Sequence, residues 1–186
     1  MNRILTSAIL SVILLTARAF AEEPITVERF REIAATPGDS VPLNDKLRIT
    51  PVWTNSVISL SLKYNDGKAF QEKLTATTKT VAGKYIISSV QSKFLPKPID
   101  SILSYDENAR RYKVWGLAEG KIVEGTMIFD LDKKTFATQA AYGDGLTELG
   151  LGSFSDTETS SRTFVYKNGT LLNTREMKTS PTSEGK

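Results

Sequence analysis

The chain has 186 residues, a net charge of +3 and 40% hydrophobic residues, and it contains neither cysteine nor histidine. This length allows one domain with a core of its own, and without cysteine that core must be stable without disulfide bonds. The lack of histidine removes the commonest general base and the commonest transition-metal ligand. The small net charge gives no electrostatic reason to expect a nucleic acid as partner.

Residues 1–21 have the pattern of a secretory signal peptide. Arg3 gives a positive start, and Ile4–Thr16 is an apolar run shorter than the roughly 20 residues that span a bilayer. Ala19-Phe20-Ala21 is a small-x-small cleavage site. An uncleaved anchor is the alternative. Since no later stretch approaches a transmembrane helix, we expect an exported protein, periplasmic or extracellular, without an integral membrane segment after cleavage.

Residues 22–55 are predicted to form one short helix and an irregular leader. The helix is expected near Thr26–Ala35, because Thr26 can cap it and apolar residues recur about every third position. Pro37-Gly38-Asp39 ends it. The following residues, up to 55, contain two prolines and the lone Trp53. We expect them to pack across a sheet or to close one end of it.

Residues 56–178 show short β-prone runs separated by turn residues, followed by a polar tail at 179–186. The clearest turns are Asn65-Asp66-Gly67 and Asn168-Gly169. The ten expected strands are Ser56–Tyr64, Lys68–Val81, Tyr85–Phe94, Ile99–Tyr105, Arg110–Leu117, Lys121–Phe129, Thr135–Tyr142, Leu146–Ser155, Ser161–Lys167 and Thr170–Lys178.

No helical crossover separates these strands, so neighbours should be antiparallel. So many twisted strands tend to curl, and closure removes their exposed edges. The sequence therefore predicts an all-β fold: an antiparallel up-and-down meander of about ten strands, closed or nearly closed into a lipocalin-like barrel. A sandwich is the alternative. A barrel spanning an outer membrane is not expected, because Lys68–Thr80 and Thr170–Lys178 are too polar for a lipid-facing band.

The order of features resembles that of a family of secreted, lipocalin-like β-barrels of unknown function. The matching residues are Tyr105-Asp106, Tyr112, Trp115, Glu124-Gly125, Asp132-Lys133-Lys134-Thr135 and Phe164–Met177. The resemblance extends over about Ser56 to Met177. The Gly-Thr-Trp opening usual in that family is absent, and Trp53 stands in Pro-Val-Trp-Thr. The resemblance implies a barrel outside the cytoplasm and carries over no catalytic residue.

Aromatic side chains and methionine are concentrated in the second half of the chain, where they could line a cavity for a small apolar or amphipathic ligand. Ordinary core packing is the alternative. On the strand 110–117 the inward face is undecided, since Tyr112 and Val114 share one side while Lys113 and Trp115 share the other. A probe in such a cavity is expected to quench Trp115. The candidate ligand-binding residues are Tyr112, Trp115, Met127, Phe129, Tyr142, Phe164 and Tyr166.

Other chemistry has weaker support in the sequence. The turn Asp130–Lys134 lacks the ligands of a calcium loop, and Ser153–Ser160 offers at most a loose ion site. Glu124 and Arg175 could pair across the barrel or point outward. No residue pattern indicates a catalytic site, a metal or a cofactor.

Three functions remain open. The first is a barrel that binds a small molecule, and the second is an exported interaction or inhibitor module with a packed barrel and an unknown protein partner. The third is a carboxylate-based hydrolase, for which Glu124 and Asp144 are the most interesting acids.

Overall fold

The computed structural model describes residues 25–49, 51–118 and 120–182. The predicted signal peptide and the end of the polar tail lie outside the described residues.

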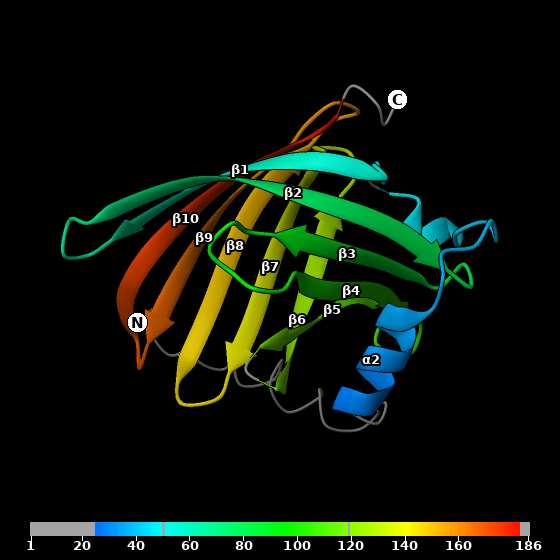
Figure 1. Ribbon diagram of the computed structural model, residues 1–186, viewed down its shortest axis with the longest axis horizontal. Coiled ribbons are helices and arrows are strands. Elements are labelled where there is room, and N and C mark those ends of the chain that lie inside the picture. The colour runs from blue at the N-terminus through cyan, green and yellow to red at the C-terminus, as the bar shows by residue number, and fades with distance from the viewer. Residues whose placement is uncertain (1–24, 50, 119, 183–186) are drawn as a thin grey trace, which may run out of the picture.

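Ten strands form a closed antiparallel barrel in which each strand pairs with the next and β1 pairs with β10 (Figure 1). The closing β1–β10 pairing joins the two ends of a single sheet, so the predicted up-and-down barrel is confirmed and the sandwich is wrong. The strands are β1 (Asn55–Tyr64), β2 (Ala69–Val81), β3 (Tyr85–Gln91), β4 (Ile99–Asp106), β5 (Arg111–Ala118), β6 (Lys121–Asp130), β7 (Thr135–Tyr142), β8 (Leu146–Phe154), β9 (Thr159–Lys167) and β10 (Thr170–Pro181).

The strand register decides which side chains face the barrel interior. Alternate residues of a strand point to opposite faces, and residues paired across neighbouring strands share a face. One inward row runs from β5 to β9 through Val114, Gly125, Ala140, Glu148 and Val165. The residues between these positions point outward.

Helix α2 (Val27–Ala35) covers the outside of the barrel wall near β4 and β5 (Figure 1). It begins where expected, with the Thr26 hydroxyl accepting a hydrogen bond from the backbone N–H of Arg29 at 3.2 Å. Its buried face packs Phe30 and Ile33 into a cluster with Ile102 and Trp115. A large part of the apolar core therefore lies between the helix and the outer face of the sheet.

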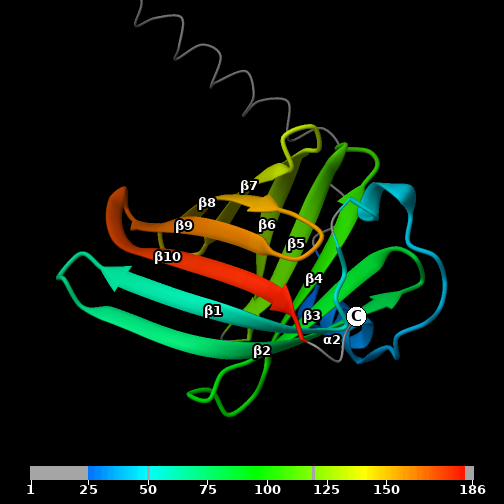
Figure 2. The ribbon, with the colours of Figure 1, turned by 90° about the horizontal axis from the view of Figure 1, so that it is seen from above.

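The leader after α2 lies across the barrel end at which β4 ends and β5 begins (Figure 2). Its short 3-10 helix η1 (Asp45–Leu47) places Leu47 in a fully buried position, 1% exposed. The Tyr112 hydroxyl donates to the backbone oxygen of Lys46 at 2.7 Å, and the N–H of Asn44 donates to Gly83 O at 2.8 Å. These contacts fit the second of the two expectations for the leader, that it closes one end.

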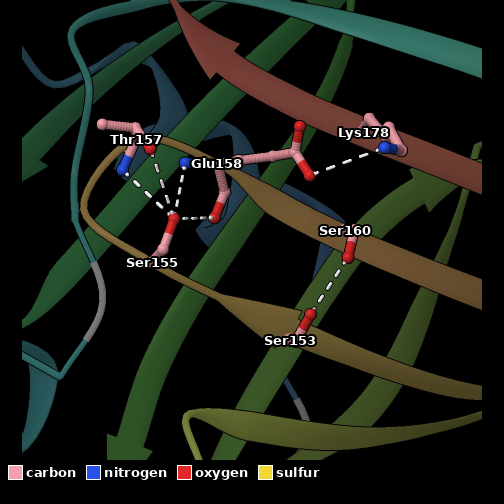
Figure 3. A network of polar contacts seen from close by, with 6 residues as sticks. All are labelled: Ser153, Ser155, Thr157, Glu158, Ser160 and Lys178. Carbon is pink, nitrogen blue, oxygen red and sulfur yellow. Dashed lines mark hydrogen bonds and ion pairs between the residues drawn. The ribbon is translucent and has the colours of Figure 1, made fainter.

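The β8–β9 turn satisfies its own polar groups (Figure 3). The Ser155 hydroxyl oxygen accepts from the backbone N–H of Thr157 and of Glu158, at 3.3 and 3.0 Å. Glu158 also forms an ion pair of 3.7 Å with Lys178 on β10. Of the two acids that suggested a loose ion site, Asp156 and Glu158, the second is thus engaged in holding the turn, together with the Ser155 hydroxyl.

None of the helices in the described ranges is long and apolar enough to cross a membrane.

Candidate ligand cavity inside the barrel

Inside the barrel, between β4 and β10, lies a cavity of about 340 Å³ that is partly open to solvent. Its wall is mostly apolar, with Val114, Val123 and Met127 from β5 and β6. Met177 closes it from β10, and the polar side chains on its wall include Thr138, Tyr142, Glu148 and Thr163. An apolar space with a few converging polar groups is typical of a small-molecule site.

Glycine in the wall keeps this space open. A Cβ built on Gly116 would meet nothing within 4 Å, so the missing side chain leaves room in the cavity. On the next strand, a Cβ on Gly125 would lie 3.0 Å from Gln139 O and 3.2 Å from the Cβ of Ala140. The first glycine thus provides volume, whereas the second allows β6 and β7 to pack closely.

The polar end of the cavity is built on an ion pair. Arg175 on β10 places Nη1 2.9 Å from Oε1 of Glu148 on β8, whose side chain is only 15% exposed. The Tyr142 hydroxyl also donates to Glu148. Burial, followed by the negative charge and the hydrogen bond of Glu148, raises the pKa of Tyr142 to about 12. At neutral pH the three groups therefore carry one negative and one positive charge, beside a neutral phenol.

A β-bulge sets the direction of the β10 side chains. Leu171 pairs with Tyr166, whereas Asn173 pairs with Val165, so Leu172 is the extra residue. Beyond the bulge, Asn173 and Arg175 are on the inward face. Among the described residues, the Oδ1 atom of Asn173 is one of two buried side-chain polar atoms without a hydrogen-bond partner. Such atoms are rare, because leaving a buried acceptor unpaired costs about 1–3 kcal/mol.

Four of the seven candidate residues predicted from the sequence face the interior. Met127 and Tyr142 line the cavity. Tyr112 and Phe129 lie in an aromatic cluster at the leader end, with ring centroids 4.8 Å apart, and Phe129 also contacts Phe154 at 5.9 Å. This cluster separates the cavity from the leader.

The other three candidates have their side chains on the outside of the barrel. Phe164 and Tyr166 alternate with the inward-facing Thr163 and Val165. The Trp115 indole packs under α2 and donates from Nε1 to Glu124 at 2.9 Å. Trp115 also borders the cavity, but its indole lies on the outer face, so a cavity-bound probe would have to quench it across the barrel wall. The expected quenching stays a prediction. The uncertainty about the strand 110–117 is resolved with Tyr112 and Val114 inward.

Glu124 and Arg175 neither pair across the barrel nor both point outward, the two alternatives left open by the sequence. Glu124 points outward and Arg175 points inward, where it binds Glu148. Asp144 lies exposed in the β7–β8 turn. The structure therefore does not bring Glu124 and Asp144 together in the cavity. Within the described ranges, no group of three or more acidic residues could hold a metal ion.

The sequence did not reveal Glu148 as a site residue. It stands in Leu-Thr-Glu-Leu-Gly, where an acid among alternating apolar residues indicates a solvent-facing position. The signal that could have found it is an arginine on a late strand with no nearby acid on its own face, which Arg175 provides.

The fold and the cavity define a class of protein, the closed ten-stranded antiparallel barrel with an internal space. No family model and no curated protein matches the chain. Among solved structures, it is similar to a protein of unknown function from the DUF3598 family of Nostoc punctiforme PCC 73102, with a TM-score of 0.52 and 14% sequence identity. The match covers 80% of this chain and 53% of that chain, so it spans about half of the neighbour's length. At this identity the likeness shows the fold alone.

Proposed function

We propose that this protein binds a small amphipathic molecule inside the barrel. The observation that supports it is the cavity of about 340 Å³, whose wall is mostly apolar and whose one charged lining residue is Glu148, beside Tyr142. An apolar tail would lie against Val114, Val123 and Met127, and a polar head would lie at the ion pair. Closed barrels of this kind can enclose one small ligand.

The volume limits the size of the ligand. At about 30 Å³ for each water-sized group, the cavity holds roughly eleven non-hydrogen atoms. An eight-carbon chain with a polar head fits this limit. Burying its methylenes contributes about 6 kcal/mol at about 0.8 kcal/mol each. The cost of association offsets most of this gain, so a dissociation constant no tighter than the millimolar range is expected.

The methionines provide a direct test. The chain has three, and two of them, Met127 and Met177, line the cavity. In protein labelled with ¹³C at the methionine methyl groups, 1-octanol should shift both of these resonances in a saturable titration. Calorimetry of the same titration should show a negative heat-capacity change, which marks apolar burial.

A filled cavity provides the matched control. Gly116→Leu adds a side chain where nothing lies within 4 Å, so it should occupy the cavity and weaken octanol binding at least tenfold. Thr75→Leu adds the same side chain to an exposed, outward position on β2 and should leave binding unchanged. If a saturated solution of octanol shifts neither methyl resonance, or if Gly116→Leu binds as the wild type does, the proposal is wrong.

We also propose that the protein is exported, on the grounds of the charged start, the short apolar run and Ala19-Phe20-Ala21 in the sequence. Mass spectrometry of the protein from its native host should find Glu22 at the N-terminus. A mature chain that retains Ile4–Thr16 would contradict cleavage.

A further inference from the structure

We infer that the cavity selects a ligand whose head group is uncharged and donates a hydrogen bond, as an aliphatic alcohol does, and that it rejects carboxylates. This inference rests on the proposed binding function. It concerns the chemistry of the head group, which the shape of the cavity alone does not determine.

The charge at the polar end is already balanced. Glu148 lines the cavity, and its Oε1 is bound by Arg175 at 2.9 Å and its carboxylate by the Tyr142 hydroxyl. A carboxylate has about four lone-pair positions, so Glu148 can accept further hydrogen bonds. The cavity therefore offers a ligand the Glu148 carboxylate as a hydrogen-bond acceptor, and Arg175 balances the charge of that carboxylate.

A ligand with a carboxylate head group would bind weakly at the polar end of the cavity. It would have to leave water and lie against Glu148, a carboxylate of the same charge whose side chain is 15% exposed. Glu148 lines the cavity whereas Arg175 is not among its lining residues, and the Arg175 guanidinium is engaged by Glu148 at 2.9 Å. Contacts between like charges are strongly unfavourable where water is largely displaced.

An ammonium head would gain little here. Its attraction to Glu148 is offset by the nearby positive charge of Arg175, and it loses its hydration on leaving water. A hydroxyl is desolvated at a much lower cost and can donate to Glu148 directly. The expected order of affinity is alcohol first, ammonium second and carboxylate last.

The test compares three probes with the same eight-carbon chain at pH 7, namely 1-octanol, octanoate and octylammonium. Binding is followed by the methyl resonances of Met127 and Met177 in the wild-type protein. We expect octanol to bind at least tenfold more tightly than octanoate, with octylammonium between them. If octanoate binds as tightly as octanol, the inference is wrong while the binding function stands. If none of the three binds, the binding function itself fails.

Variants of Glu148 and Arg175 test whether this ion pair causes the selectivity among the three probes. Glu148→Gln removes the repulsion and leaves Arg175 unpaired, so octanoate should become at least tenfold tighter than in the wild type. Arg175→Gln leaves Glu148 uncompensated, so octylammonium should become the tightest of the three. The matched control is the outer-face pair of Arg162 on β9 and Glu176 on β10, whose Nε–Oε1 distance is 2.9 Å. Arg162→Gln and Glu176→Gln should keep the wild-type order.

Breaking a partly buried pair can destabilise a protein, so the double variant Glu148→Gln/Arg175→Gln is included, since it leaves no unpaired charge. It should fold, as judged by circular dichroism, and should lose most of the discrimination against octanoate. Wild-type selectivity in this double variant would overturn the inference, because the selectivity would then come from elsewhere in the cavity.

Discussion

A buried ion pair outside the cavity is the strongest electrostatic feature at the scale of single residues. Lys113 Nζ lies 3.0 Å from Asp106 Oδ2, and the two side chains are 7% and 3% exposed. Asp106 also accepts from the N–H of Ala109 at 2.9 Å, in the turn between β4 and β5. Burial alone would raise the pKa of Asp106, but these hydrogen bonds and the charge of Lys113 outweigh it, so its pKa lies below the ordinary value.

Because the pKa of Asp106 is depressed in the folded state, its contribution to stability is present above the unfolded pKa of about 4 and is lost at lower pH. Asp106→Asn should therefore lower the free energy of unfolding at pH 7 by about 3–5 kcal/mol. The difference from wild type should shrink as the pH falls below about 4, in urea titrations across that range.

The matched control is Asp130→Asn. Asp130 pairs with Lys133 at 3.2 Å, but those side chains are 43% and 77% exposed, so less than about 1 kcal/mol is expected. If Asp106→Asn and Asp130→Asn lowered the free energy of unfolding equally, the buried pair would contribute no more to stability than the exposed pair.

Tyr142 gives a second pH effect, of opposite direction. Its pKa is raised to about 12 in the folded protein, against about 10 in the unfolded chain, so its contribution is complete below pH 10 and is lost as the pH rises towards 12. Wild type should lose more stability over that range than Tyr142→Phe. The other tyrosines titrate in both proteins and cancel in the comparison. Parallel pH profiles would contradict the raised pKa.

At the scale of elements, α2 acts as an outer support for the barrel wall. Phe30 is 1% exposed and packs with Ile102 and Trp115, on the side of the sheet away from the cavity. Phe30→Ala should thus cost about 3–5 kcal/mol in urea denaturation while octanol affinity remains unchanged in the folded protein. The exposed Arg31→Ala on the same helix should cost little. A parallel loss of affinity in Phe30→Ala would mean that the helix also shapes the cavity.

The sequence predicts the elements well because their signals are local. Turns such as Asn168-Gly169 need a positive φ, and both residues have one, at 49° and 81°. The sequence could not predict which side chains of β5 point inward, because this part of the barrel wall has apolar surroundings on both faces, the cavity inside and α2 outside. Val114 faces the cavity and Trp115 faces α2, so apolar residues occupy both sides. Likewise, the bulge at Leu172 leaves no clear mark in the sequence, yet it sets the direction of Arg175.

At the scale of the whole molecule, the two ends of the barrel differ: the leader covers one end, and the cavity opens at the other. At one end lie the leader and the aromatic cluster of Tyr112, Phe129 and Phe154. At the opposite end, Ile99 begins β4; it lines the cavity and is nevertheless 49% exposed. A residue that both lines a cavity and meets solvent marks the place where the cavity opens. A ligand is therefore expected to enter at the Ile99 end.

This asymmetry predicts which substitutions change the rate of binding. Ile99→Trp should slow association and dissociation of octanol together, with little change in the dissociation constant, because it narrows the passage without altering the polar end. The control at the other end of the barrel is Gly83→Ala, which disturbs the leader.

Gly83 has a φ of +64°, and an added Cβ would lie 2.5 Å from Pro42 O, so the leader must shift and stability should fall. The two rates, measured by relaxation dispersion of the Met127 and Met177 methyl groups, should nonetheless stay at their wild-type values in Gly83→Ala. The reverse pattern, with rates raised by Gly83→Ala and unaffected by Ile99→Trp, would instead make the leader the gate of the cavity.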